Sequence, residues 1–121
     1  MTGAGFPRAR RLKNNSAFKA VIDRRIKAAD KLLTVFASPN GLEYSRLGVS
    51  VGRNSGGAVR RNALKRMMRE VWRQSQEVIP PGCDCVIMMT KKTQPVLPTY
   101  KEMYWSFQAL MTDLRTRWEC R

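Results

Sequence analysis

The segment from residue 56 to residue 73, GGAVRRNALKRMMREVWR, mixes apolar and basic side chains in a pattern that an α-helix would sort onto two faces. An α-helix turns by about 100° per residue, so the apolar side chains fall on one broad arc and the cations on the opposite one. An arc of this kind faces the core of a globular domain. We predict a helix from residue 58 to about residue 76, with a packing face made of Val59, Ala63, Leu64, Met67 and Val71.

The opposite face of this predicted helix is almost purely basic, with Glu70 as the only acid in the segment. Like charges four residues apart repel by about 0.2–0.5 kcal/mol per pair. A face that is merely solvated usually interleaves the two signs for internal pairing. We therefore interpret it as a polyanion-binding face, made of Arg61, Asn62, Lys65, Arg66, Arg69 and Arg73.

The chain as a whole is also strongly basic. Its 121 residues contain 23 Lys and Arg against 9 Asp and Glu, which gives a formal net charge of +14. A field of this strength favours a polyanionic partner, and we favour nucleic acid over a membrane surface. The first residues, MTGAGFPRARRLK, contain no apolar signal core, and the longest apolar run, 86–89, is far too short to span a bilayer. We expect a soluble, cytoplasmic protein without a membrane partner.

The sequence offers little catalytic machinery. It contains no histidine, which removes Ser-His and Cys-His pairs and the commonest general base. Its acidic residues are scattered singly, whereas a two-metal nuclease needs carboxylates that converge on ions about 4 Å apart. We expect Cys83 and Cys85 to be buried strand residues, because structural zinc needs four Cys or His ligands. We therefore predict a binding protein with no catalytic residue and no metal site of its own.

The rest of the chain predicts two further helices and three strands. One helix covers about residues 15–24, and another begins after Pro98, where Thr99 and Glu102 form a capping-box pattern. β-rich or alternating runs predict strands at 31–37, 45–52 and 84–89. This order of elements indicates a single α+β domain, residues 1–121, with helices packed on a small sheet.

The predicted strand at 45–52 has two different faces. Leu47, Val49 and Val51 form its apolar face. Small residues on the opposite face would let another chain approach the sheet closely, although an ordinary solvated face explains them equally well. That opposite face carries Arg46, Gly48, Ser50 and Gly52.

Several of these stretches together form a recognisable signature. The stretches are RLGVSV at 46–51, GAVRRN at 57–62, KR at 65–66 and RE at 69–70. FPR at 6–8, RLK at 11–13, Phe18 in the first helix and Asp84 at the start of a strand add to it. Nearly the whole chain thus resembles the bacterial ribonuclease P protein subunit.

That resemblance implies a fold and a function. The fold is a small, mainly antiparallel sheet of about four strands packed with three helices, with a left-handed βαβ crossover, resembling a ribosomal-protein domain. The function is that of the protein subunit of an endoribonuclease. Its catalytic RNA partner cleaves precursor tRNA with Mg²⁺ to leave the mature 5′ end, and the protein binds that RNA and the 5′ leader. The isolated protein is expected to be inactive.

The resemblance also implies roles for named residues. The RNA subunit, or the metal-rich region near it, would contact Arg53, Arg60, Arg61, Asn62, Lys65, Arg66, Arg69 and Arg73. The leader would lie in a cleft between the first helix and the sheet, against Phe18, Ile22, Phe36 and Ser50. We add Gly48 to this site, because small residues keep the strand low enough for a nucleotide chain. Residues 1–14 would form a basic arm that carries Arg8, Arg10, Arg11 and Lys13.

Some positions depart from the family pattern, and other interpretations stay open. Arg53-Asn54 stands where the family usually has two lysines, Ala63 where it has an arginine, and Ile22 where it often has an aromatic residue. Phe18 and Phe36 could instead belong to the hydrophobic core. The main alternative function is a ribosomal or ribosome-assembly RNA-binding protein. A DNA-binding module is disfavoured, because the basic helix mostly offers phosphate-binding cations rather than base-reading side chains.

Overall fold

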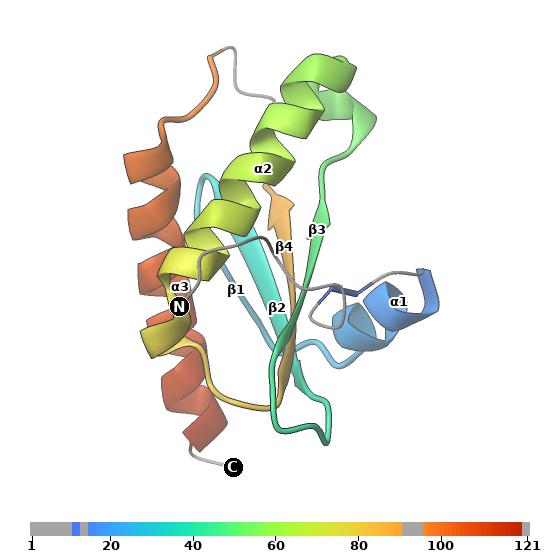
Figure 1. Cartoon of the computed structure of the whole chain (residues 1–121), viewed down its shortest axis with the longest axis vertical. Helices are drawn as coiled ribbons and strands as arrows, with labels where there is room; N and C mark the ends of the chain where they lie inside the picture. Colours follow the sequence, from blue (N-terminus) through green and yellow to red (C-terminus); the bar gives the residue numbers. More distant parts are fainter. Residues whose placement is uncertain (1–10, 13–14, 91–95, 120–121) are drawn as a thin grey trace.

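The computed structural model describes residues 11–12, 15–90 and 96–119, and it has the predicted α+β architecture. Three helices and four strands follow one another along the chain (Figure 1). They are α1 (Asn15–Asp23), β1 (Lys27–Ala29), β2 (Leu33–Pro39), β3 (Arg46–Ser50), α2 (Ala58–Gln74), β4 (Cys83–Met89) and α3 (Tyr100–Glu119). None of the described helices is long and apolar enough to cross a membrane.

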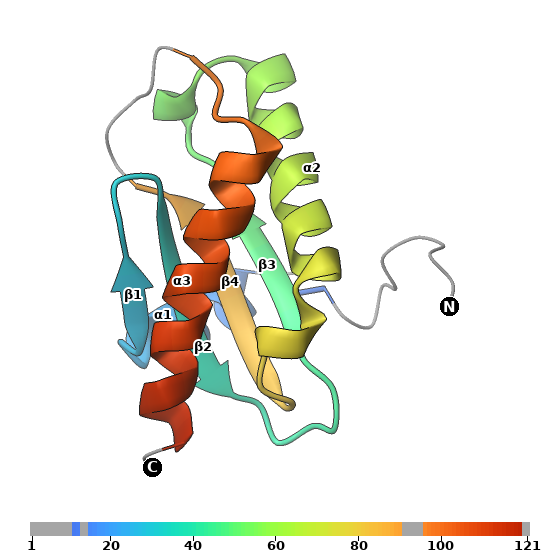
Figure 2. The same cartoon turned by 90° about the vertical axis from the view of Figure 1, so that its left-hand side faces the viewer.

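The four strands form one mixed sheet in the order β1-β2-β4-β3. β2 is antiparallel to both β1 and β4, whereas β3 is parallel to β4. In Figure 2, β3 and β4 both point upward, α2 lies in front of the sheet, and β4 lies to the left of β3. The β3-α2-β4 crossover is therefore left-handed, against the usual rule and as expected.

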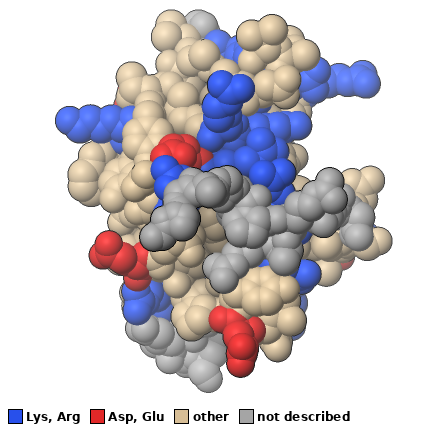
Figure 3. Space-filling view, in the orientation of Figure 1, with Lys and Arg blue, Asp and Glu red and all other residues tan. Residues whose placement is uncertain are grey.

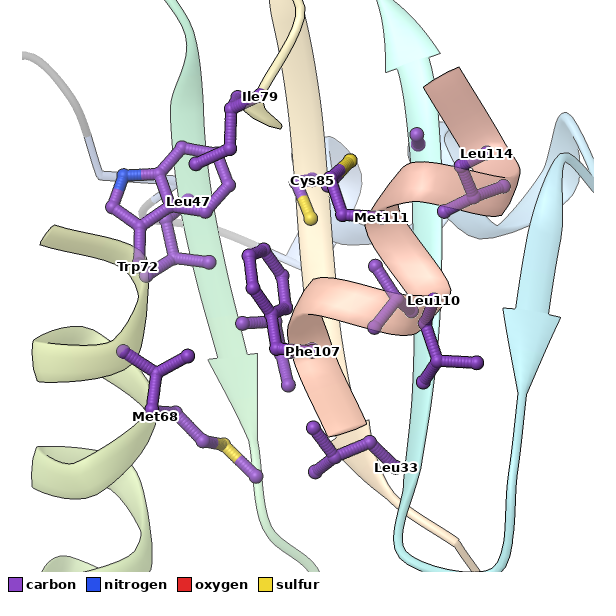
Figure 4. Close-up of a cluster of buried hydrophobic side chains, with 14 of the residues drawn as sticks. Leu33, Leu47, Met68, Trp72, Ile79, Cys85, Phe107, Leu110, Met111 and Leu114 are labelled. Carbon is purple, nitrogen blue, oxygen red and sulfur yellow. The ribbon is translucent and has the colours of Figure 1, made fainter. Parts of the chain in front are cut away.

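The helices cover the two faces of the sheet unequally: α2 and α3 lie on one face, and α1 lies on the other (Figures 1 and 2). Because side chains alternate along a strand, β4 contributes to both layers. Cys85 and Ile87 belong to the larger core under α2 and α3, while Val86 belongs to a smaller core under α1. Figure 4 shows Phe107 and Met111 of α3 lying beside Cys85 in the larger core.

The buried face of α2 is rotated from the predicted one. Leu64, Met68, Val71 and Trp72 are at most 1% exposed, whereas the prediction that Val59 packs on the core was wrong, because its side chain is 87% exposed. The first turn of α2 extends beyond the end of β3, so Val59 has no sheet to pack on (Figure 1). Packing is therefore carried by the later turns of the helix.

The structure contains the predicted capping box at the start of α3. The backbone N–H of Glu102 donates to Thr99 Oγ1 at 3.1 Å, and the N–H of Thr99 donates to Glu102 Oε1 at 2.8 Å. These two bonds satisfy donors that a helix start leaves without internal partners. The capping box fixes where α3 begins and therefore which residues face α2.

β1 was not predicted. It has only three residues, Lys27, Ala28 and Ala29, and none of them is β-branched or aromatic. Its existence depends on pairing with β2, where Lys27 lies opposite Phe36. Pairing partners of this kind are not visible in a local sequence pattern.

Candidate nucleic-acid interface

The basic face of α2 points away from the sheet because the apolar face packs against it. Asn62 and Arg66 are exposed, and Lys65 and Arg69 are half-buried. Figure 3 shows Lys and Arg side chains gathered on this side of the molecule, over and beside α2. The first turn of α2 contains no acid that would neutralise them. The predicted clustering of these cations is confirmed, and their contact with RNA stays a prediction.

The chain before α1 adds a cation to this face. The backbone N–H of Leu12 donates to Leu47 O at 2.9 Å, so residues 11–12 lie along the free edge of β3. This pairing brings Arg11 close to Arg69. Burial, and secondarily the charge of Arg11, lower the pKa of the Arg69 guanidinium. Two cations held this close together favour an anion between them. Arg8, Arg10 and Lys13 of the predicted arm lie outside the described residues.

Three of the predicted RNA contacts are placed differently from the rest. Arg73 donates to Glu70 through Nε at 3.1 Å and Nη2 at 2.5 Å, so its charge is already paired within α2. The side chain of Arg60 folds back over Gly56, where an added Cβ would lie 2.5 Å from Arg60 Cδ. Arg53 is exposed in the 3-10 turn Arg53–Ser55, ahead of the helix. The core of the face is therefore the part of α2 from Arg61 to Arg69.

Arg61 belongs to the basic face and lies in the first turn of α2. Its side chain is half-buried, and its Nε has no hydrogen-bond partner among the described residues. A buried donor without a partner carries a desolvation cost of about 1–3 kcal/mol. An anionic ligand that reaches this nitrogen would remove that cost.

A groove of about 570 Å³ lies between α1 and β3 and unites part of the predicted leader site. Phe18, Ile22 and Ser50, which the resemblance assigns to the leader site, line it. Lys65 reaches the same groove from α2. The other lining residues are Asn15, Lys19, Asp23, Val49 and Val51. The groove thus has an apolar interior and a polar rim, which suits a single nucleic-acid strand.

Phe36 and Gly48 lie outside this lining. Phe36 is 9% exposed and packs in the smaller core with Val21 and Val86, so its placement matches the alternative interpretation of a core residue. A Cβ on Gly48 would lie 2.6 Å from Phe18 Cζ. The missing side chain at Gly48 therefore makes room for the Phe18 ring, and not directly for a nucleotide chain.

Sequence reasoning missed the polar rim of the groove. Lys19 and Asp23 form an ion pair at 3.0 Å on the exposed side of α1, where the two side chains are 75% and 59% exposed. Their spacing of four residues matches that of Phe18 and Ile22, which was the available signal. A solvated helix face gives the same signal, so the groove could be identified only once α1 was placed beside β3.

A second polar cluster, also unpredicted, lies at the other end of β3 from the groove. Arg46 donates to Asp84 through Nε at 2.8 Å and Nη2 at 2.6 Å, and Asn40 Nδ2 donates to Asp84 Oδ1 at 2.8 Å. The hydrogen bonds to Asp84 raise the pKa of Arg46. These contacts join β3 to β4 and keep the edge strand in place beside α1.

No group of three His, Cys, Asp or Glu that could hold a metal ion occurs in the described part of the chain. Cys83 and Cys85 are both fully buried in β4, as predicted, and burial raises the pKa of Cys83 to about 12. We therefore assign no metal ligands to these residues.

Comparison with known proteins identifies the family of this chain and supports its fold. The Ribonuclease P family profile matches residues 6–115. The ribonuclease P protein component of Thermotoga petrophila is 41% identical over 87 residues, covering 72% of this chain and 74% of that protein. That of Chromobacterium violaceum is 36% identical over 115 residues, covering 94% and 93%. The solved ribonuclease P protein of Thermotoga maritima superposes with a TM-score of 0.67 at 32% identity, covering 88% of this chain and 96% of that one. The chain therefore belongs to the ribonuclease P protein family.

Proposed function

We propose that the chain binds the catalytic RNA of ribonuclease P through α2 and the 5′ leader of precursor tRNA through the groove between α1 and β3. Phosphate contacts by Arg61, Lys65, Arg66 and Arg69 would supply affinity that depends on salt. Phe18 and Ile22 would supply surfaces on which unpaired bases stack or pack.

One observation carries this proposal: Lys65 belongs to the basic face of α2 and also lines the groove. The two surfaces are therefore continuous, and an RNA subunit on α2 would lie next to a strand in the groove. A ribosomal or ribosome-assembly protein would need the basic face but has no evident use for the groove, and the family match favours ribonuclease P.

The cleavage chemistry is assigned to the RNA subunit. In this assignment Mg²⁺ held by the RNA would supply the chemistry that hydrolyses the phosphodiester bond. The protein contributes binding and orientation, since its sequence contains no histidine and its described residues form no carboxylate cluster. The proposed partners are therefore the RNA subunit and precursor tRNA.

Reconstitution tests the proposal directly. The protein is combined with a bacterial ribonuclease P RNA at a Mg²⁺ concentration that limits the RNA alone, and 5′ cleavage of precursor tRNA is followed. We expect stimulation by the wild-type protein and a reduced effect of Lys65→Ala. Arg117→Ala serves as the control, because Arg117 lies on α3 and pairs with Asp113. Binding to ribosomal RNA with no effect on cleavage would favour the ribosomal alternative instead.

A further inference from the structure

A second groove, of about 530 Å³, lies on the other flank of α2, between α2 and α3. It is lined by Glu70, Gln74, Tyr100, Lys101 and Tyr104. None of these residues belongs to the groove between α1 and β3. α2 thus separates two grooves, with its basic face between them.

Two aromatic side chains of α3, Tyr100 and Tyr104, line this second groove, and Trp105 lies beside Tyr104 outside the lining. The ring centroids of Tyr100 and Tyr104 are 6.0 Å apart, and those of Tyr104 and Trp105 are 5.1 Å apart with the planes at 83°. Tyr100 is 37% exposed and Trp105 is 60% exposed. Trp is usually largely buried, and the core face of α3 is already supplied by residues such as Phe107. Tyr100 and Trp105 therefore lie outside the core and are accessible to a ligand.

The charges around the groove suit an RNA ligand. Glu70 is the one acid in the lining, but Arg73 and Gln74 both donate hydrogen bonds to its carboxylate. These bonds lower the pKa of Glu70 and offset its negative charge. Lys101 supplies a cation on the α3 side. Figure 3 shows the basic patch bordered, on the side where Figure 1 places α3, by one acidic group and then by mostly uncharged surface.

We propose that this second groove binds an unpaired base of the ribonuclease P RNA subunit by stacking on Tyr100, and that Trp105 extends the aromatic surface beside the groove for a neighbouring base. The inference rests on the proposed function, because the RNA must lie across α2. Its phosphates would contact Arg66 and Arg69, and a base leaving the strand on the α3 side would reach the aromatic rings. The leader is not the source of this base, since the leader occupies the opposite flank of α2. Aromatic stacking accepts any base, so the groove adds affinity without a strong sequence preference.

The test compares the affinity of the full-length protein for an RNA subunit transcript across four variants. Tyr100→Ala and Trp105→Ala should each weaken binding about fivefold or more. Tyr100→Phe should bind like the wild type, because the ring is kept. Leu42→Ala is the control, since Leu42 has nearly the same exposure, 38%, in the turn between β2 and β3. The slope of log affinity against log salt should stay unchanged, because stacking releases no counterions.

Each outcome has a defined meaning. Unchanged RNA affinity in both alanine variants would overturn the inference. Loss of self-association in sedimentation, with RNA affinity intact, would instead make this surface a protein interface and would also overturn it. If Tyr100→Ala perturbs folding, Trp105→Ala decides alone, because its ring is mostly exposed. Preference for precursor over mature tRNA should persist in both variants. Failure of the proposed function would appear separately, as a wild-type protein that does not bind the RNA subunit.

Discussion

Gly48 determines how deeply the Phe18 ring can sit against β3. A Cβ at this position would lie 2.6 to 3.0 Å from three atoms of that ring, which is closer than real side chains approach. Gly48→Ala should therefore displace the ring and destabilise the protein by about 1–3 kcal/mol, the usual cost of overpacking. Gly52→Ala is the matched control, because a Cβ there meets nothing within 4 Å. Urea unfolding measures both variants, and equal stability of the two would contradict this role of Gly48.

Variants of Phe36 distinguish a role in the hydrophobic core from a role in leader binding. Its burial in the smaller core predicts that Phe36→Ala costs about 3–5 kcal/mol in the free energy of unfolding. Ile22→Ala, at a half-buried position in the groove, should instead weaken precursor tRNA binding more than mature tRNA binding. Urea unfolding and tRNA titrations distinguish the two variants. A stable Phe36→Ala protein with a selective loss of precursor binding would restore Phe36 to the leader site.

At the scale of elements, local signals predicted the helices well and the sites less well. The capping box of Thr99 and Glu102 and the two-faced pattern of α2 depend on neighbouring residues, so they were visible in the sequence. β1 was missed because it exists only through pairing with β2. The rim residues Lys19 and Asp23 were missed because an exposed helix face looks the same whether or not a strand lies opposite it.

The basic face of α2 makes a prediction about salt dependence. Each neutralised phosphate releases counterions, so Arg66→Ala with Arg69→Ala should reduce the slope of log affinity against log salt by somewhat less than one unit per lost contact. The measurement is RNA subunit binding over a range of KCl concentrations, with Arg117→Ala as the control. An unchanged affinity and slope in the double variant would mean that the face is only solvated.

The burial of β4 makes a prediction about thiol reactivity and pH. Burial raises the pKa of Cys83 to about 12 and also raises that of Cys85. In a Cys120→Ser background, neither thiol should react with an aromatic disulfide reagent at pH 8 until the protein unfolds. The pKa values of the two thiols are raised in the folded protein, so folding favours their neutral form. The stability that the neutral thiols contribute is therefore complete below the unfolded thiol pKa and is lost as the pH rises towards 12. Rapid reaction of either thiol in the native protein would contradict the burial.

At the scale of the whole molecule, we propose that the protein is a scaffold that holds binding surfaces and leaves the chemistry to RNA. The isolated protein should therefore show no 5′ cleavage of precursor tRNA in the presence of Mg²⁺. The assay uses protein treated to remove RNA, with the reconstituted complex as the positive control. Specific cleavage that survives this treatment would require catalytic groups in the chain itself.

The most direct measurement of the central claim is a photocrosslink from the leader. Precursor tRNA with 4-thiouridine in the 5′ leader is bound to the reconstituted complex and irradiated, and the crosslinked peptides are identified. We expect crosslinks within residues 15–23 and 49–51, which line the groove between α1 and β3. They should be lost with mature tRNA, which has no leader. Leader crosslinks confined to other surfaces, such as α3, would contradict the assignment of the leader to this groove.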